Sequence, residues 1–164
     1  MTSTSGTRSL LVVCLNPPSE SSGNRTLHAV AAASRALGCQ VGKVANLCTA
    51  PTASVVELNG RLTRPSDWID HRDSLRRELE AASVIVGAWG ISGLTGEARR
   101  IRDDQVTWLF AAAGAAGHRH IWLVGGEARH PSRWHQYVAD KHGRTSGGSL
   151  EQRLLDVMHP RRLT

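Results

Sequence analysis

The chain has 164 residues, of which 40% are hydrophobic, and this fits one folded domain and excludes extensive disorder. No apolar run approaches the roughly 20 residues needed to cross a bilayer, so we expect no membrane segment. Lysine and arginine outnumber aspartate and glutamate by 20 to 14. This balance favours a polyanionic partner, above all nucleic acid, although an arginine-rich composition can equally reflect a GC-rich genome.

The first residues and the cysteines indicate the cellular setting. Residues 1–8 are mostly small and polar and do not resemble a signal peptide, so we expect a flexible leader before a single domain over 9–164. Cys14, Cys39 and Cys48 are scattered and lack metal-ligand spacing. We therefore expect free thiols in a reducing cytoplasm, without a metal site or a cofactor.

Residues 10–15 form an unbroken apolar run, typical of a strand that is buried on both faces. Asn16-Pro17-Pro18 ends the run, because proline cannot donate to a strand ladder. Asn16 then lies at the carboxyl end of a central strand, where open α/β sheets bind ligands. The alternative interpretation is that Asn16 only begins a turn.

Strands and helices alternate along the rest of the chain. Helices are expected over 26–37, 69–82, 95–115 and 134–142, and a last one from Ser149 to just before Pro160, which leaves a basic tail. Further strands are expected over 41–47, 83–89 and 120–124. We therefore predict an α/β fold, a three-layer α/β/α sandwich around a four-stranded parallel sheet of order 2-1-3-4.

Four expected strand ends meet at one edge of this sheet, and they carry Asn16-Pro17, Asn46, Trp89-Gly90 and His130-Pro131-Ser132. In order and spacing these landmarks resemble the uracil-DNA glycosylase superfamily, and the short chain is similar to its compact, mismatch-specific branch. The landmarks are also similar to those of domain-of-unknown-function family 1643. This resemblance implies that the chain is a member of that family and a distant relative of the glycosylases. Three features depart from the glycosylase pattern: Leu15 lies near where glycosylases often have a small residue, Asn16 stands in place of aspartate, and Arg133-Trp134 follow the histidine motif.

The resemblance implies a uracil-DNA glycosylase-like fold and an N-glycosidase that hydrolyses the base–sugar bond of a flipped uracil-type or modified base. Asn16 would orient the attacking water, and His130 would donate to the leaving base. Asn46 would read the edge of the base, since an amide offers one donor and one acceptor. His28 would stack on the base.

Three residues after the last expected strand are candidates for contact with DNA: Ser132, Arg133 and Trp134. Trp134 can act as a wedge in the duplex or, equally, pack a short helix. Arg99, Arg100 and Arg102 are expected to form a solvated helix face rather than a phosphate track. Phe110 lies inside a predicted helix, so we do not expect it to contact a base.

Two other functions remain open. The protein can hydrolyse a free modified nucleoside or nucleotide, or it can bind a nucleic acid or nucleotide without catalysis. DNA is a more probable polymer partner than RNA, and nothing in the sequence indicates a membrane or a partner protein.

Overall fold

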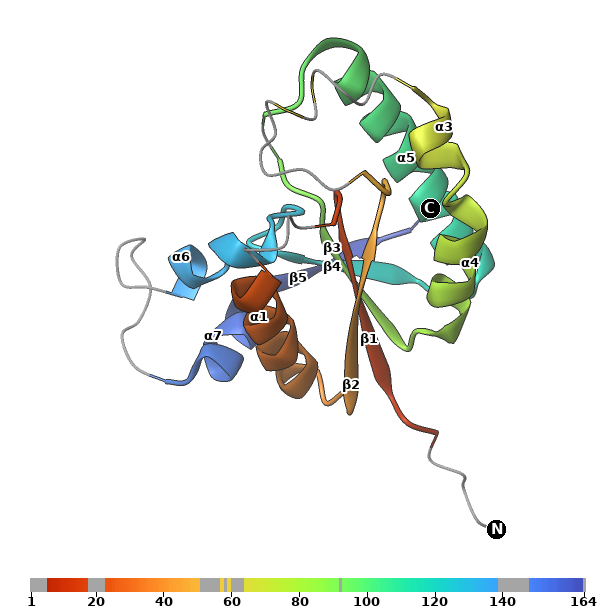
Figure 1. Cartoon of the computed structure of the whole chain (residues 1–164). Coiled ribbons are helices and arrows are strands. Elements are labelled where there is room, and N and C mark those ends of the chain that lie inside the picture. Colours follow the sequence, from red (N-terminus) through yellow and green to blue (C-terminus); the bar gives the residue numbers. More distant parts are fainter. Residues whose placement is uncertain are drawn as a thin grey trace.

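The computed structural model describes residues 6–17, 23–50, 57, 59, 64–91, 93–138 and 148–163 (Figure 1). Residues 1–5 of the expected leader lie outside these ranges. So do residues 139–142 of the helix expected over 134–142.

A five-stranded sheet forms the centre of the molecule, with the strand order β2-β1-β3-β4-β5. The strands are β1 (Ser9–Cys14), β2 (Val41–Asn46), β3 (Val84–Ala88), β4 (His120–Val124) and β5 (Met158–Arg162). The first four are parallel, and β5 runs antiparallel to β4. β1 pairs with both β2 and β3, so the strand beginning near Leu10 is central, as expected.

Helices cover both faces of the sheet, which confirms the α/β class (Figure 1). α1 (Gly23–Ala36) and α7 (Leu150–Val157) lie on one face, while α4 (Arg72–Ala81) and α5 (Gly96–Ala115) lie on the other. Three short elements complete the described fold: α3 (Ser66–Ile69), the 3-10 turn η1 (Pro131–Arg133) and α6 (His135–Val138). No helix in the described part of the chain is both long and apolar enough to span a membrane.

The apolar run of β1 is explained by two hydrophobic cores. Leu11 and Val13 pack into the core beneath α4 and α5, and Leu10 and Val12 pack into the core beneath α1 and α7. All four side chains are at most 1% exposed. Because successive strand residues point to opposite faces, a strand between two helical layers has to be apolar at every position.

The expectation of a four-stranded, purely parallel sheet is wrong, because residues 158–162 form β5 rather than a basic tail. Only Met158 of this strand is buried, and its other four residues are exposed. A polar edge strand lacks the apolar alternation by which strands are recognised, and Pro160 is tolerated at a sheet edge.

Two helix boundaries also differ from expectation. The helix expected over 69–82 begins later, as α4 from Arg72. Ile69 is instead the last residue of the short helix α3. The helix expected from Trp134 starts earlier, as the turn η1 from Pro131. The capping box at Ser149 is confirmed, since its hydroxyl accepts from the backbone of Gln152 and the Gln152 side chain accepts from the backbone of Ser149.

Candidate functional site

The ends of β1 and β2 bring Asn16 and Asn46 to neighbouring positions at the carboxyl edge of the sheet. Asn46 pairs with Cys14 in the ladder, two residues before Asn16. Backbone hydrogen bonds extend the pairing past both strands, from the Leu47 N–H to the Cys14 carbonyl. The Asn16 side-chain amide donates to the carbonyl of Ala50 at 3.2 Å, which ties the loops after the two strands together.

Asn46 carries a buried polar atom without a partner. Its Oδ1 is buried and accepts no hydrogen bond in the described structure. Such a group costs roughly 1–3 kcal/mol, and buried polar groups are nearly always paired in folded proteins. The amide oxygen of Asn46 thus has unused capacity to accept a hydrogen bond at the carboxyl edge of the sheet.

Two thiols flank the asparagines, and both are unreactive. Burial raises the pKa of the Cys14 thiol to about 12 and that of Cys48 to about 11. Both thiols are therefore protonated near neutral pH, and neither is a nucleophile or a metal ligand there. Chemistry at this edge therefore depends on amides and imidazole.

The loop after β4 folds back toward the centre of the edge. The Gly90 N–H after β3 donates to the carbonyl of Ala128 at 2.6 Å, and Val124 forms bridges with Glu127 and Ala128. Next along the chain, η1 packs against α1, which also packs against β2 (Figure 1). His130 thus lies at the same edge of the sheet as Asn16 and Asn46.

Trp89 comes directly after β3, and its ring packs closely against the backbone of Gly87. The side chain is 8% exposed, and a Cβ at Gly87 would lie 2.8 Å from its ring. The missing side chain at Gly87 therefore lets the indole lie back along its own strand. Trp89 is part of the core beneath α5, so the Trp-Gly landmark shapes the edge and does not present an aromatic side chain to solvent.

The hydrogen bonds of His130 define which ring nitrogen carries its proton. The Nδ1 atom accepts the backbone N–H of Ser132 at 3.3 Å and lies 2.9 Å from the Ser132 hydroxyl. An acceptor nitrogen carries no proton, so in the neutral ring the proton is on Nε2. Burial lowers the pKa of His130 below its ordinary 6.5, and the charge of Arg133 lowers it further. The site therefore holds a neutral imidazole with a single N–H donor.

A group of side chains fixes the backbone around His130. The indole N–H of Trp134 donates to the Arg129 carbonyl at 2.8 Å, and the Arg129 guanidinium lies 4.4 Å from the centre of the Tyr137 ring. Arg129 also pairs with Glu127 at 2.8 Å, while its Nε is buried without a partner. Sequence reasoning missed Arg129 and Tyr137, although Tyr137 is the only tyrosine of the chain.

The other predicted site residues fall into different environments. Trp134 is 1% exposed and packs in the core beneath α1, so it is not available as a wedge in DNA. Ser132 is half-buried against His130, as described above, and Arg133 is exposed next to it. His28 is exposed on α1, apart from the buried stripe that begins at Ala29, and its expected role in stacking on a base stays a prediction.

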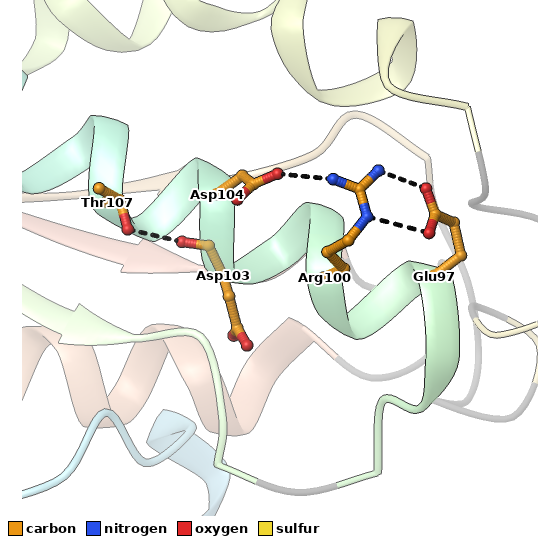
Figure 2. Close-up of polar contacts among 5 residues, drawn as sticks. All are labelled: Glu97, Arg100, Asp103, Asp104 and Thr107. Atoms are coloured by element: carbon orange, nitrogen blue, oxygen red, sulfur yellow. Dashed lines mark hydrogen bonds and ion pairs between the residues drawn. The ribbon is translucent and has the colours of Figure 1, made fainter.

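The arginines of α5 are neutralised along their own helix. Figure 2 shows the Arg100 guanidinium between the carboxylates of Glu97 and Asp104. Arg102 pairs with Asp103 at 2.8 Å, and Arg99 reaches the same carboxylate at 4.0 Å. Arg99 and Arg100 are exposed, as expected for a solvated helix face, whereas Arg102 is largely buried. In the part of the chain that the structure describes, no cluster of histidine, cysteine, aspartate or glutamate could hold a metal ion.

Residues 2–132 match a protein family of unknown function, DUF1643. No curated protein and no solved structure matches the chain. Nothing in these comparisons connects the chain with the uracil-DNA glycosylase superfamily, so that resemblance rests on the strand-end motifs alone.

Proposed function

The chain belongs to the DUF1643 family, whose function is unknown, so its activity has to be inferred from its own side chains. We propose that it hydrolyses an N-glycosidic bond. The substrate is a uracil-type or modified base, flipped out of DNA. The observation that carries this proposal is the neutral imidazole of His130, which has its proton on Nε2.

Breaking an N-glycosidic bond puts negative charge on the departing base. Water forms a bond to C1′ while the bond from C1′ to the base nitrogen breaks, the electron pair leaves with the base, and the added water releases a proton to solvent. The charge develops on a carbonyl oxygen of the base, and a positioned N–H donor stabilises it in the transition state. The Nε2–H of His130 has the chemistry of such a donor, and the base afterwards takes a proton from solvent.

Asn46 supplies a reason for the base to be of the uracil type. A buried amide oxygen needs an N–H donor, and the amide nitrogen of the same side chain needs an acceptor. The imide edge of uracil presents an N–H next to a carbonyl, which satisfies both groups. Cytosine presents an unprotonated ring nitrogen at that position, so it would leave the oxygen unpaired and is rejected.

Asn16 would orient the attacking water through its amide, which is not a general base. The reaction therefore depends on the stability of the leaving base, and we expect slow turnover or a substrate with a good leaving group. Arg133 is exposed beside His130, where it would contact a phosphate of the substrate.

The test is a panel of oligonucleotides that carry uracil, hypoxanthine, xanthine or an alkylated base, scored for abasic sites. We expect release of uracil or a base with the same imide edge, and loss of roughly a hundredfold in rate in His130→Ala. Arg133→Ala is the control: binding weakens, while the rate at saturating DNA changes little. Absence of release from every oligonucleotide would contradict the DNA glycosylase reaction.

The same variants distinguish the two alternatives. If the protein acts on a small substrate, free nucleosides and nucleotides are cleaved and His130→Ala abolishes that cleavage. If it only binds, DNA associates with a clear salt dependence and no base is released from any substrate. The amide of Asn16, which stands where hydrolysis would profit from a carboxylate, is the feature that favours the binding alternative.

A further inference from the structure

A groove runs along α5 beside the edge formed by β4 and β5, on the face of the sheet opposite α1. Two cavities with volumes of about 670 and 610 Å³ make up the groove, and Phe110 borders both. The larger cavity reaches Gly90 and Gly126 at the carboxyl edge of the sheet, and the smaller reaches Arg119 at the opposite edge. The two cavities share Phe110 and Ala111 in their linings, so they lie next to each other along α5 between the two edges of the sheet.

The groove carries positive charge that the fold does not neutralise. Arg119, Arg161 and Arg162 are exposed, and none of them forms an ion pair with another described residue. Among the described residues that line the smaller cavity, none is acidic. The larger has Asp103 and Glu127, and each of these already pairs with an arginine. An anion in the groove therefore meets arginines whose charges are uncompensated.

An aromatic side chain lies in the same groove. Phe110 is half-buried, and the Arg161 guanidinium stands over its ring at 4.9 Å from the centre. The helix residues that line the groove extend from Arg102 to Gly114, a length of about 18 Å. A basic channel with an aromatic stacking surface is the combination that binds single-stranded nucleic acid.

We propose that this groove binds a single strand of nucleic acid. Arg119, Arg161 and Arg162 contact its phosphates, and Phe110 with the overlying Arg161 guanidinium provides the surface on which a base stacks. The inference does not depend on the proposed hydrolysis, because it requires binding and no chemistry. It also places the contact on a different face from Ser132 and Arg133.

The test measures the binding of a fluorescent oligothymidylate by anisotropy over a range of salt concentrations. In Arg161→Gln/Arg162→Gln we expect affinity to fall by roughly tenfold or more at low salt, and the slope of log affinity against log salt to decrease by about 1.4. The matched control is Arg99→Gln/Arg100→Gln, which removes the same net charge where carboxylates already neutralise it. This control should change affinity by less than about twofold.

A further variant makes the result specific. Arg119 lies outside β5, so Arg119→Gln cannot damage the edge strand. Weaker binding by this variant would therefore report the loss of a contact with the nucleic acid. The measurement reports binding and needs no base release, so a failure of the proposed hydrolysis does not affect it. Equal losses in the two double variants, no binding by the wild type, or binding of free phosphate or of duplex DNA as tight as that of the single strand would each overturn the proposal.

Discussion

At the scale of single residues, the buried amide of Asn46 separates a functional from a structural interpretation. A structural asparagine stabilises the fold through its hydrogen bonds, but the Oδ1 of Asn46 accepts none in the described structure. Replacing it with alanine removes a buried acceptor that costs roughly 1–3 kcal/mol when unpaired. We therefore expect Asn46→Ala to unfold at the same temperature as the wild type or above it, while base release or ligand binding is lost. A clear drop in melting temperature would contradict this assignment.

His130 makes a second prediction, which concerns pH. Because its pKa is lowered in the folded protein, the unfolded chain binds more protons below pH 6.5, and the free energy of unfolding falls as the pH decreases through this range. Above pH 6.5 the contribution of His130 is complete and constant. In urea unfolding between about pH 5 and pH 8, the stability difference between wild type and His130→Gln should shrink toward low pH.

Activity should follow the same titration, since the donor acts in its neutral form. We expect the rate of base release to be constant above pH 6.5 and to fall only below the lowered pKa of His130. A rate that increases on acidification would show that the imidazolium is the active form, and it would exclude the assigned tautomer.

These residues also show what sequence reasoning can find. Asn16, Asn46 and His130 were predicted because each lies at or beyond the carboxyl end of an expected parallel strand, where such sheets bind ligands, and because these landmarks resemble glycosylase motifs. The contacts of Arg129 and Tyr137, which support the loop before His130, could not be predicted, because they depend on the path of that loop. Trp134 was equally compatible with packing and with contact to DNA, and only its burial decides between them.

At the scale of elements, the loop between β4 and α6 depends on one glycine. Gly125 has a φ of +68°, and a Cβ there would lie 2.5 Å from the ring of Tyr137. Tyr137 in turn stacks under Arg129, the residue before His130. The glycine therefore allows the ring to approach the backbone and support the loop.

We expect Gly125→Ala to lower the free energy of unfolding by about 2 kcal/mol or more, through backbone strain and displacement of Tyr137. Gly126→Ala is the matched control, since Gly126 also has a positive φ of +81° but has no atom within 4 Å of an added Cβ. The difference between the two variants in chemical denaturation measures the contact with Tyr137. Equal destabilisation would show that strain alone is responsible.

Two of the elements that the sequence predicted to within one residue differ in their pattern: one has an unbroken apolar run, and the other is a long helix whose apolar pattern is loose. They are β1 and the helix α5, expected over 95–115 and observed over Gly96–Ala115. β5 was missed because its sequence, Met-His-Pro-Arg-Arg, has only one apolar residue that is buried. Its other four residues are exposed, so it lacks the alternation of apolar and polar residues that indicates a strand. Its pairing with β4 is set by the position of α7, whose last residue, Val157, directly precedes it.

At the scale of the whole molecule, β5 closes the sheet and also carries two of the unpaired arginines. It covers the outer edge of β4, whose residues Ile121 and Leu123 are buried. An apolar strand without a neighbour on one side pairs readily with other chains. The same five residues therefore have a role in stability and, in the proposed groove, a role in binding.

Truncation after Val157 tests the first of these roles. We expect the shortened chain to melt about 5–10 °C below the wild type, because it loses the β4–β5 pairing and the buried side chain of Met158. Its exposed β4 edge should also cause association that increases with concentration in light scattering. Arg161→Gln/Arg162→Gln keeps the strand and removes only the charges, so it should melt like the wild type and remain monodisperse under the same conditions. If the double variant is destabilised as much as the truncation, the arginines themselves stabilise the fold, and weaker nucleic-acid binding by that variant would no longer report on the groove.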